Sequence, residues 1–259
     1  MDAPASALEA LLRRDRLAVV AGLAGTIALS WLYLVPVSRD MYGAMDGLSA
    51  WMMEGTWDGR YLLLIFLMWT VMMVGMMLPS AAPTLLLFAN VVRKSDSQNA
   101  PVARTYVFAG GYLLAWTVFS LAATLLQWAL AETALLSPMM ITTSPALGAL
   151  ILMAAGIYQW TPLKQSCLTR CRSPADFLSR HWRPGFTGAL RMGAWHGLYC
   201  VGCCWVLMLL LFFGGVMSLT WIAAITIFVL LEKLAPFGAQ GGRLSGALLC
   251  LAGVGVLVW

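Results

Sequence analysis

Two long stretches of the chain, residues 61–92 and 192–231, contain no Asp, Glu, Lys or Arg. A helix of about 20 apolar residues crosses the hydrocarbon core of a bilayer, and a helix satisfies all of its backbone hydrogen bonds internally. Only 10% of the residues are charged, whereas a soluble domain carries about 25%. We therefore expect an all-α, polytopic integral membrane bundle that is embedded in lipid and forms a single domain over residues 1–259.

The apolar segments predict about seven transmembrane helices. Gly214 and Gly215 are expected to form the turn that divides the second charge-free stretch. Pro79 and Pro83 are expected to kink the second span. The basic segment Pro162–Pro184 is predicted to be a loop. No small-residue cleavage site follows the first apolar run, so we expect that run to be retained. The predicted spans are about 17–35, 61–90, 105–131, 145–161, 191–213, 216–232 and 243–259.

The positions of the basic residues predict the orientation of the bundle. With the N-terminus inside and seven spans, only Arg39 and Arg60 fall outside, against fourteen Lys and Arg residues inside. Such an excess marks the cytoplasmic side, so the N-terminus is predicted inside and the C-terminus outside. The net charge of +5 arises in the segments between apolar runs and therefore does not indicate a nucleic-acid partner. The inside residues are Arg13, Arg14, Arg16, Arg93, Lys94, Arg104, Lys164, Arg170, Arg172, Arg180, Arg183, Arg191, Lys233 and Arg243.

One histidine and three cysteines fall on one side of the fifth predicted span. A helix advances about 100° per residue, so His196, Cys200, Cys203 and Cys204 lie within about 120° of arc. Gly193, Gly197 and Gly202 lie among them, and small residues let a neighbouring membrane helix approach closely. Imidazole and thiolate together are ligands for a soft metal ion.

Methionines follow a similar pattern in the second predicted span. Met72 and Met76 are one helical turn apart, and Met73 and Met77 form a second row beside them. The two spans run in opposite directions, so both sulfur clusters are predicted near the middle of the bilayer. Thioether and thiolate ligands select Cu(I), whereas Mg²⁺ and Ca²⁺ prefer carboxylates, which are almost absent from these spans.

Each of these residues also has a plainer interpretation. Methionine stripes and buried cysteines commonly serve packing, and a lone intramembrane histidine commonly makes one interhelical hydrogen bond. Cys167 and Cys171 are spaced like a two-ligand metal clip but could equally be idle thiols. Glu232 and Lys233 are predicted to form a surface pair at the end of the sixth span. The chain lacks a P-loop, a nucleophile elbow and an HExxH motif, so we expect no enzymatic activity.

Three segments, together with Glu232-Lys233, resemble a bacterial family of predicted metal-binding integral membrane proteins. The family began as a domain of unknown function, and some of its members are copper transport accessory proteins that serve copper enzymes. The resemblance covers about residues 61–233 and implies a multi-pass protein of the bacterial inner membrane that handles copper. The segments are MWTVMMVGMMLPSAAP at 68–83, YQWTPLKQSCLTRCRSP at 158–174 and GAWHGLYCVGCCWVLM at 193–208.

We therefore expect a protein that binds Cu(I) between transmembrane helices and delivers or transports it for maturation of a cuproenzyme. The predicted metal ligands are His196, Cys200, Cys203, Cys204, Met72, Met73, Met76 and Met77. The alternative is a non-catalytic subunit or assembly factor of a larger membrane enzyme complex. A thiol oxidoreductase ranks third, because the chain has no Cys-x-x-Cys at a helix start.

Overall fold

The computed structural model describes residues 7–47, 49–53, 56–95 and 100–258, and this part of the chain is helical without named strands. Trp259, the last residue of the seventh predicted span, lies outside the described residues. The elements are α1 (Ala7–Met41), the short 3-10 helix η1 (Ala50–Met53), α2 (Gly59–Ser95), α3 (Pro101–Glu132), α4 (Pro145–Tyr158), α5 (Pro162–Arg172), α6 (Pro174–His181), α7 (Gly185–Gly214), α8 (Leu219–Leu234) and α9 (Gly238–Val258).

Five of the described helices, α1, α2, α3, α7 and α9, are long and apolar enough to cross a membrane. The pair α4 and α5 meets the same test only as a unit bent by 63°, which gives up to six spans. The predicted turn at Gly214-Gly215 is confirmed, since α7 ends at Gly214 and α8 begins at Leu219. Helix α8 has 16 residues and is therefore about 24 Å long, which is shorter than a hydrocarbon core of about 30 Å.

The segment Pro162–Pro184, predicted as a loop, contains the two short helices α5 and α6. Both begin with a proline at the first helical position, where the missing N–H would have had no helical partner. The Thr161 hydroxyl accepts a hydrogen bond from the Lys164 N–H at 3.3 Å and caps α5. The prolines therefore start helices here, and the prediction of a loop was wrong.

Helix α2 likewise continues through Pro79 and Pro83. A proline at position 79 leaves the carbonyl of Gly75 without its usual helical donor. The Trp31 indole of α1 donates to that carbonyl at 3.3 Å. This hydrogen bond helps a helix with internal prolines to stay intact inside the bundle.

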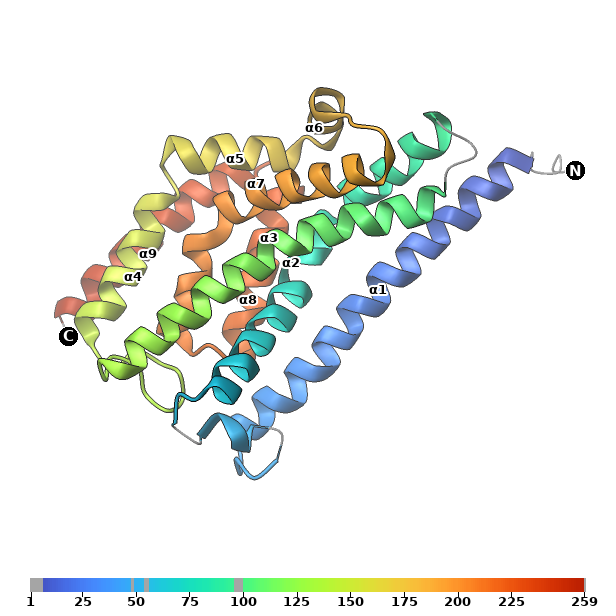
Figure 1. The fold of residues 1–259 in the computed structure, drawn as a ribbon. Helices are drawn as coiled ribbons and strands as arrows, with labels where there is room; N and C mark the ends of the chain where they lie inside the picture. The colour runs from blue at the N-terminus through green and yellow to red at the C-terminus, as the bar shows by residue number, and fades with distance from the viewer. Residues whose placement is uncertain (1–6, 48, 54–55, 96–99, 259) are drawn as a thin grey trace, which may run out of the picture.

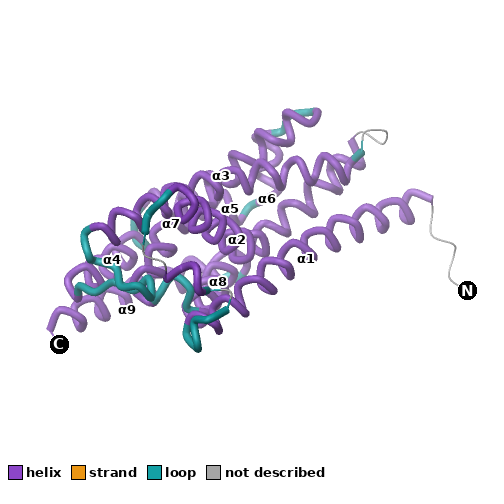
Figure 2. The backbone as a smooth tube through the Cα atoms, turned by 60° about the horizontal axis from the view of Figure 1, so that its bottom comes forward, coloured by secondary structure: helices purple, strands orange, loops and turns teal. Residues whose placement is uncertain are grey.

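Helices α3 and α7 lie side by side through the centre of the molecule, and α1 flanks the bundle beside α2 (Figure 1). Glycines permit the contact between α3 and α7. A Cβ at Gly111 would lie 2.1 Å from the Leu190 carbonyl oxygen, and one at Gly193 would lie 1.9 Å from the Phe108 carbonyl oxygen. Helices α4 and α9 pack together on the side of the bundle opposite α1 (Figure 2).

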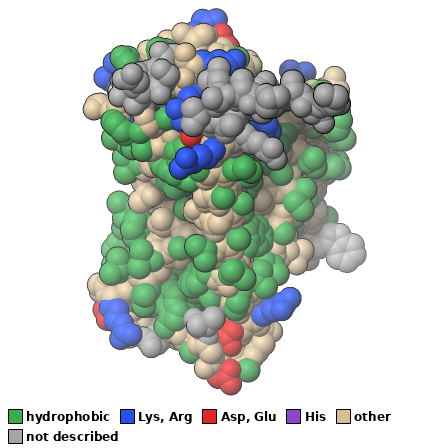
Figure 3. Space-filling view, turned by 90° about the vertical axis from the view of Figure 1, so that its right-hand side faces the viewer, with side chains coloured by type: hydrophobic (Ala, Val, Ile, Leu, Met, Phe, Trp, Pro, Cys, Tyr) green, Lys and Arg blue, Asp and Glu red, His purple; other side chains and the backbone are tan. Residues whose placement is uncertain are grey.

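The surface facing the viewer in Figure 3 carries a broad hydrophobic band between two ends where charged side chains gather. Arg93, near the end of α2, pairs with Asp15, near the start of α1. The Tyr106 hydroxyl of α3 also donates to the Ala18 carbonyl of α1. These contacts place the basic starts of α1 and α3 beside the basic end of α2, so α2 runs antiparallel to both.

Candidate metal centre

The predicted sulfur cluster lies in the middle of α7 and is almost completely buried. Cys200, Cys203 and Cys204 are each at most 1% exposed. The Sγ atoms of Cys203 and Cys204 are 3.2 Å apart, and the Cys203 thiol donates to the Cys200 carbonyl at 3.2 Å. The i, i+3 and i, i+4 spacing that puts these residues on one helix face therefore gathers three thiols in a site closed to solvent.

Lys233, near the end of α8, reaches this cluster. Its Nζ donates to Cys200 Sγ at 2.8 Å and to Ser80 Oγ at 3.1 Å. The sequence-based prediction that Glu232 and Lys233 form a surface pair was wrong, because both are buried and each bonds to a different partner. A buried ammonium needs a charged or hydrogen-bonding partner, and Cys200 and Ser80 fill that role for Lys233.

Tyr112 of α3 links the cysteine cluster to the methionine helix. Its hydroxyl donates to the Met77 carbonyl at 3.0 Å and lies 3.0 Å from Cys200 Sγ. The side chain is fully buried. Tyr112 and Lys233 thus both bridge α2 and α7 at the level of Cys200, so the connection between the two helices runs through α3 and α8.

The four predicted methionine ligands, Met72, Met73, Met76 and Met77, are all at most 1% exposed. Met76 and Met77 precede Ser80 by one turn, and residues three or four apart share a helix face. Because Ser80 bonds to Lys233, this face of α2 is directed toward the cysteine cluster. Trp69 of α2 packs on Phe212 of α7 at 5.5 Å between ring centroids. Ser80 lies 11 residues after Trp69, and Cys200 lies 12 residues before Phe212. Ser80 and Cys200 are therefore at a similar level of the two helices.

His196 lies one helical turn before Cys200 in an aromatic surrounding. Its ring centroid is 5.1 Å from that of Phe177, 5.8 Å from that of Tyr112 and 6.2 Å from that of Phe108. The side chain is 2% exposed, and its Nδ1 is buried without a hydrogen-bond partner among the described residues. Buried polar atoms are almost always satisfied, so this nitrogen is a candidate for binding a ligand.

Cys167 and Cys171, left undecided from sequence, lie on α5 against the same face of α7. Cys171 is buried on α5, which packs along α7. A Cβ at Gly202 would come 2.8 Å from Cys167 Sγ, so the glycine leaves room for that thiol. The bend between α4 and α5 lays α5, with Cys167 and Cys171, along α7, the helix that carries Cys200, Cys203 and Cys204.

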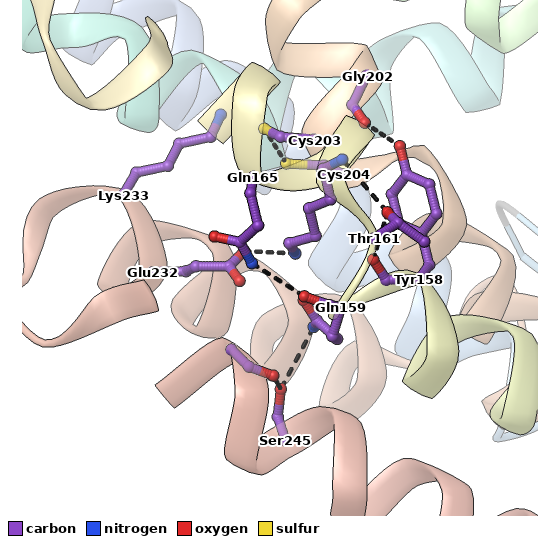
Figure 4. A network of polar contacts seen from close by, with 12 residues as sticks. Tyr158, Gln159, Thr161, Gln165, Gly202, Cys203, Cys204, Glu232, Lys233 and Ser245 are labelled. Atoms are coloured by element: carbon purple, nitrogen blue, oxygen red, sulfur yellow. Dashed lines mark hydrogen bonds and ion pairs between the residues drawn. The ribbon is translucent and has the colours of Figure 1, made fainter. Parts of the chain in front are cut away.

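A second buried polar group borders the thiols (Figure 4). Lys164 of α5 forms an ion pair with Glu232 of α8 at 2.8 Å, and the two side chains are 0% and 1% exposed. Gln159 donates to Ser245 of α9 at 3.3 Å, while Tyr158 donates to the Gly202 carbonyl of α7. These contacts join α4, α5, α7, α8 and α9 around the cysteine cluster.

The site contains soft donors and a positive charge but few oxygen ligands. Among the described residues, no group of three or more His, Cys, Asp or Glu side chains is arranged to hold a metal ion. The pair Cys203 and Cys204, and Cys200 with its Lys233 counter-charge, are arrangements of one or two thiols. Such donors suit a soft, low-coordinate ion and exclude a Ca²⁺- or Mg²⁺-type cage of oxygens.

Sequence reasoning missed Lys233, Tyr112, Ser80 and Lys164 as members of the site. Lys233 carried a usable signal, because it ends an apolar run without a neighbouring polar segment, and an intramembrane charge is a functional candidate by default. Tyr112 and Ser80 carried no such signal, since hydroxyl side chains are common in membrane helices. Lys164 stood among other basic residues of a segment predicted to be a loop.

Comparison with known proteins identifies the family of the chain. A family model described as PpoB2, copper chaperone, matches residues 66–256. Neither the curated proteins nor the solved structures searched returned a match. The matched range contains every residue of the site described above, from Met72 to Ser245. The resemblance to a copper accessory family is confirmed, and the chain belongs to the PpoB2 family of copper chaperones.

Proposed function

We propose that this protein binds Cu(I) as its cargo inside a membrane bundle and delivers or transports it for maturation of a cuproenzyme. The protein acts as a non-catalytic accessory factor in the bacterial inner membrane, with its basic end in the cytoplasm. Seven crossings, with α8 as the short one, put the two termini on opposite sides, and the basic residues favour the N-terminus inside and the C-terminus outside. The observation that carries the proposal is the buried thiol cluster formed where α5 meets α7.

The chemistry of that cluster favours Cu(I). Thiolates are the ligands that bind this ion most strongly relative to harder cations, and two of them suffice to hold it. The sulfurs of Cys203 and Cys204 are 3.2 Å apart, and Cys200 lies one turn earlier on the same face of α7, so the three thiols supply alternative pairs. Alternative pairs in one pocket allow an ion to move between them, as delivery requires.

Lys233 explains how Cys200 can be held ready for a cation inside a bundle. A charged group in a low-dielectric interior is costly unless it is paired. The 2.8 Å contact between Lys233 Nζ and Cys200 Sγ matches an ammonium beside a thiolate. Cu(I) binding at Cys200 replaces one positive neighbour by another, and Ser80 remains as a hydrogen-bonding partner for the displaced ammonium.

His196 and the methionines complete the proposed site. His196 lies one helical turn before Cys200, and its Nδ1 has no hydrogen-bond partner among the described residues. We assign this nitrogen as a third ligand to the copper ion. Met72, Met73, Met76 and Met77 are proposed as a thioether relay on the α2 side, because Met77 and Ser80 bond to the groups that contact Cys200. Thioethers bind Cu(I) weakly enough to release it.

The test compares copper retained by purified variants after anaerobic loading with Cu(I) and washing with a chelator. The wild type and a Cys250→Ser control are expected to retain copper, because Cys250 lies on α9 near Met153, away from the cluster. A Cys200→Ser/Cys203→Ser/Cys204→Ser variant is expected to retain almost none. Equal, near-zero copper in the wild type and the triple variant would refute the proposal.

A further inference from the structure

A pocket opens between α5, α6 and the middle of α7, and two arginines, Arg170 and Arg180, line it. Its volume is about 440 Å³. Arg170 and Asp176 at its rim are exposed, and Phe177 at its floor is buried. His181 and Tyr199 line its wall and are half-buried. The pocket therefore connects the exposed surface with the aromatic surrounding of His196.

His181 presents one ring nitrogen as a metal ligand in this pocket. Its Nδ1 lies 3.1 Å from the Phe177 carbonyl oxygen. A carbonyl can only accept, so Nδ1 carries the proton and the lone pair resides on Nε2. Histidines that bind metals commonly have their other nitrogen fixed in this way by a backbone carbonyl.

Phe177 packs against both histidines of the chain. The ring of His181 stacks on Phe177 with a centroid distance of 4.9 Å and an interplanar angle of 18°. His196 lies 5.1 Å from the same ring, and its Nδ1 is a buried atom without a hydrogen-bond partner among the described residues. One aromatic ring therefore separates a half-exposed imidazole from the imidazole nearest the cysteines.

We propose that this pocket is the port through which Cu(I) exchanges between the solvent outside the protein and the buried thiols. The Nε2 of His181 is a transient ligand in that exchange. The inference rests on the proposed copper function and adds a second, weaker site to it. The ion passes from His181 beside Phe177 to His196, and from there to Cys200. Phe177 lies between the two imidazoles, and the His181 ligand stabilises the ion as it passes this ring.

Two features of the structure favour this route. The His181 side chain is half-buried and accessible to solvent, whereas His196 is only 2% exposed. Two other described pockets, lined by residues such as Leu248 and Leu198, are almost wholly apolar and contain no metal-binding side chain. A ligand that only assists transfer stabilises the ion in passage, so it changes both rates and leaves the equilibrium unchanged.

The experiment measures how fast the protein in lipid nanodiscs takes Cu(I) from its bathocuproinedisulfonate complex, and how fast excess chelator removes it. His181→Asn keeps an N–H donor for the Phe177 carbonyl and removes Nε2. His181→Gln is a second non-ligating variant in case the first fails to fold. His181→Met restores a soft donor. Ser179→Ala, on the exposed side of α6, is the matched control.

Loading and release in His181→Asn are both expected to slow roughly tenfold, which corresponds to about 1.4 kcal/mol on the barrier. The copper retained at equilibrium stays at the wild-type level, and His181→Met and the control react at nearly the wild-type rate. Rates in the Asn and Gln variants within twofold of the wild type overturn the inference. Failure of His181→Met to recover, or loss of equilibrium copper in His181→Asn, also overturns it.

The two proposals fail in different ways. If the wild type retains no copper at equilibrium, the proposed function fails. If the wild type retains copper and its exchange rates do not depend on His181, only the port is refuted. The equilibrium measurement on the wild type therefore precedes the kinetic comparison.

Discussion

Replacing Lys233 by methionine tests whether Cys200 is held as a thiolate by a buried ammonium. Two unit charges separated by the observed 2.8 Å attract by about 6 kcal/mol at an effective dielectric constant of about 20. Desolvation offsets part of this attraction, and breaking one side of a buried ion pair costs about 3–5 kcal/mol. We expect Lys233→Met to lower the free energy of unfolding by that amount.

The assay is reversible unfolding in mixed detergent and dodecyl sulfate micelles, followed by the fluorescence of the 12 tryptophans. Lys94→Met is the matched control, because Lys94 is exposed at the end of α2 and its loss costs about 1 kcal/mol or less. The double variant Lys233→Met/Cys200→Ser isolates the interaction. Its destabilisation is expected to fall short of the sum of the single changes by about 2 kcal/mol.

Two results would refute the reasoning about Lys233. One is a cost for Lys233→Met no larger than that of Lys94→Met. The other is strict additivity with Cys200→Ser, since a pair that does not interact has no coupling energy. Either would mean that Lys233 and Cys200 are a neutral contact and that Cys200 has no counter-charge for a cation to replace.

Two further predictions concern the packing around the site. Gly193→Ala is expected to destabilise the bundle by about 1–3 kcal/mol, because its Cβ would lie 1.9 Å from the Phe108 carbonyl oxygen. Gly110→Ala, where no atom lies within 4 Å of the added Cβ, is expected to be neutral or stabilising in the same unfolding assay. Equal effects of the two substitutions would contradict the close packing of α3 and α7. Glu232→Gln is expected to lower the free energy of unfolding by about 3–5 kcal/mol, because it leaves the Lys164 ammonium without a counter-charge. Adding Lys164→Met is expected to recover part of that loss. A double variant whose destabilisation equals the sum of the two single changes would contradict the buried pair.

Local rules of helix geometry accounted for much of the candidate site. The 100° advance per residue put Cys200, Cys203 and Cys204 on one face of α7, and the structure buries all three. The same reasoning put Met72 and Met76 in one row of α2 and Met73 and Met77 in a second row beside it, and the structure buries all four. Which residues share a helix face depends only on residues within two or three turns of one element, whereas their role as metal ligands stays a prediction.

Predictions that depended on distant parts of the chain were less successful. Glu232 and Lys233 are adjacent, yet their partners, Lys164 and Cys200, come from other helices. The position of Lys233 at the end of an apolar run signalled a functional charge, but the local pattern did not name its partner on another helix. The two sulfur clusters, expected at a similar depth, are joined at Cys200 through Tyr112 of α3 and Lys233 of α8.

The count of membrane crossings shows a limit of a different kind. Hydropathy finds apolar segments but does not measure the path of the helix. The segment at 145–161 is only the first part of a unit bent by 63° with α5, and the sixth predicted span became a helix of 16 residues. In the segment predicted to be a loop, Pro162 and Pro174 instead begin α5 and α6, because proline is well tolerated in the first turn of a helix.

The most direct test of the account is Cu K-edge X-ray absorption of the wild-type protein loaded with Cu(I) and washed. The account predicts a copper(I) edge and a first coordination shell dominated by sulfur, with at most one nitrogen from His196. The sulfur signal is expected to survive in Cys250→Ser and to disappear in the Cys200→Ser/Cys203→Ser/Cys204→Ser variant. A shell of nitrogen and oxygen atoms in the wild type would contradict the claim that these buried thiols hold the copper.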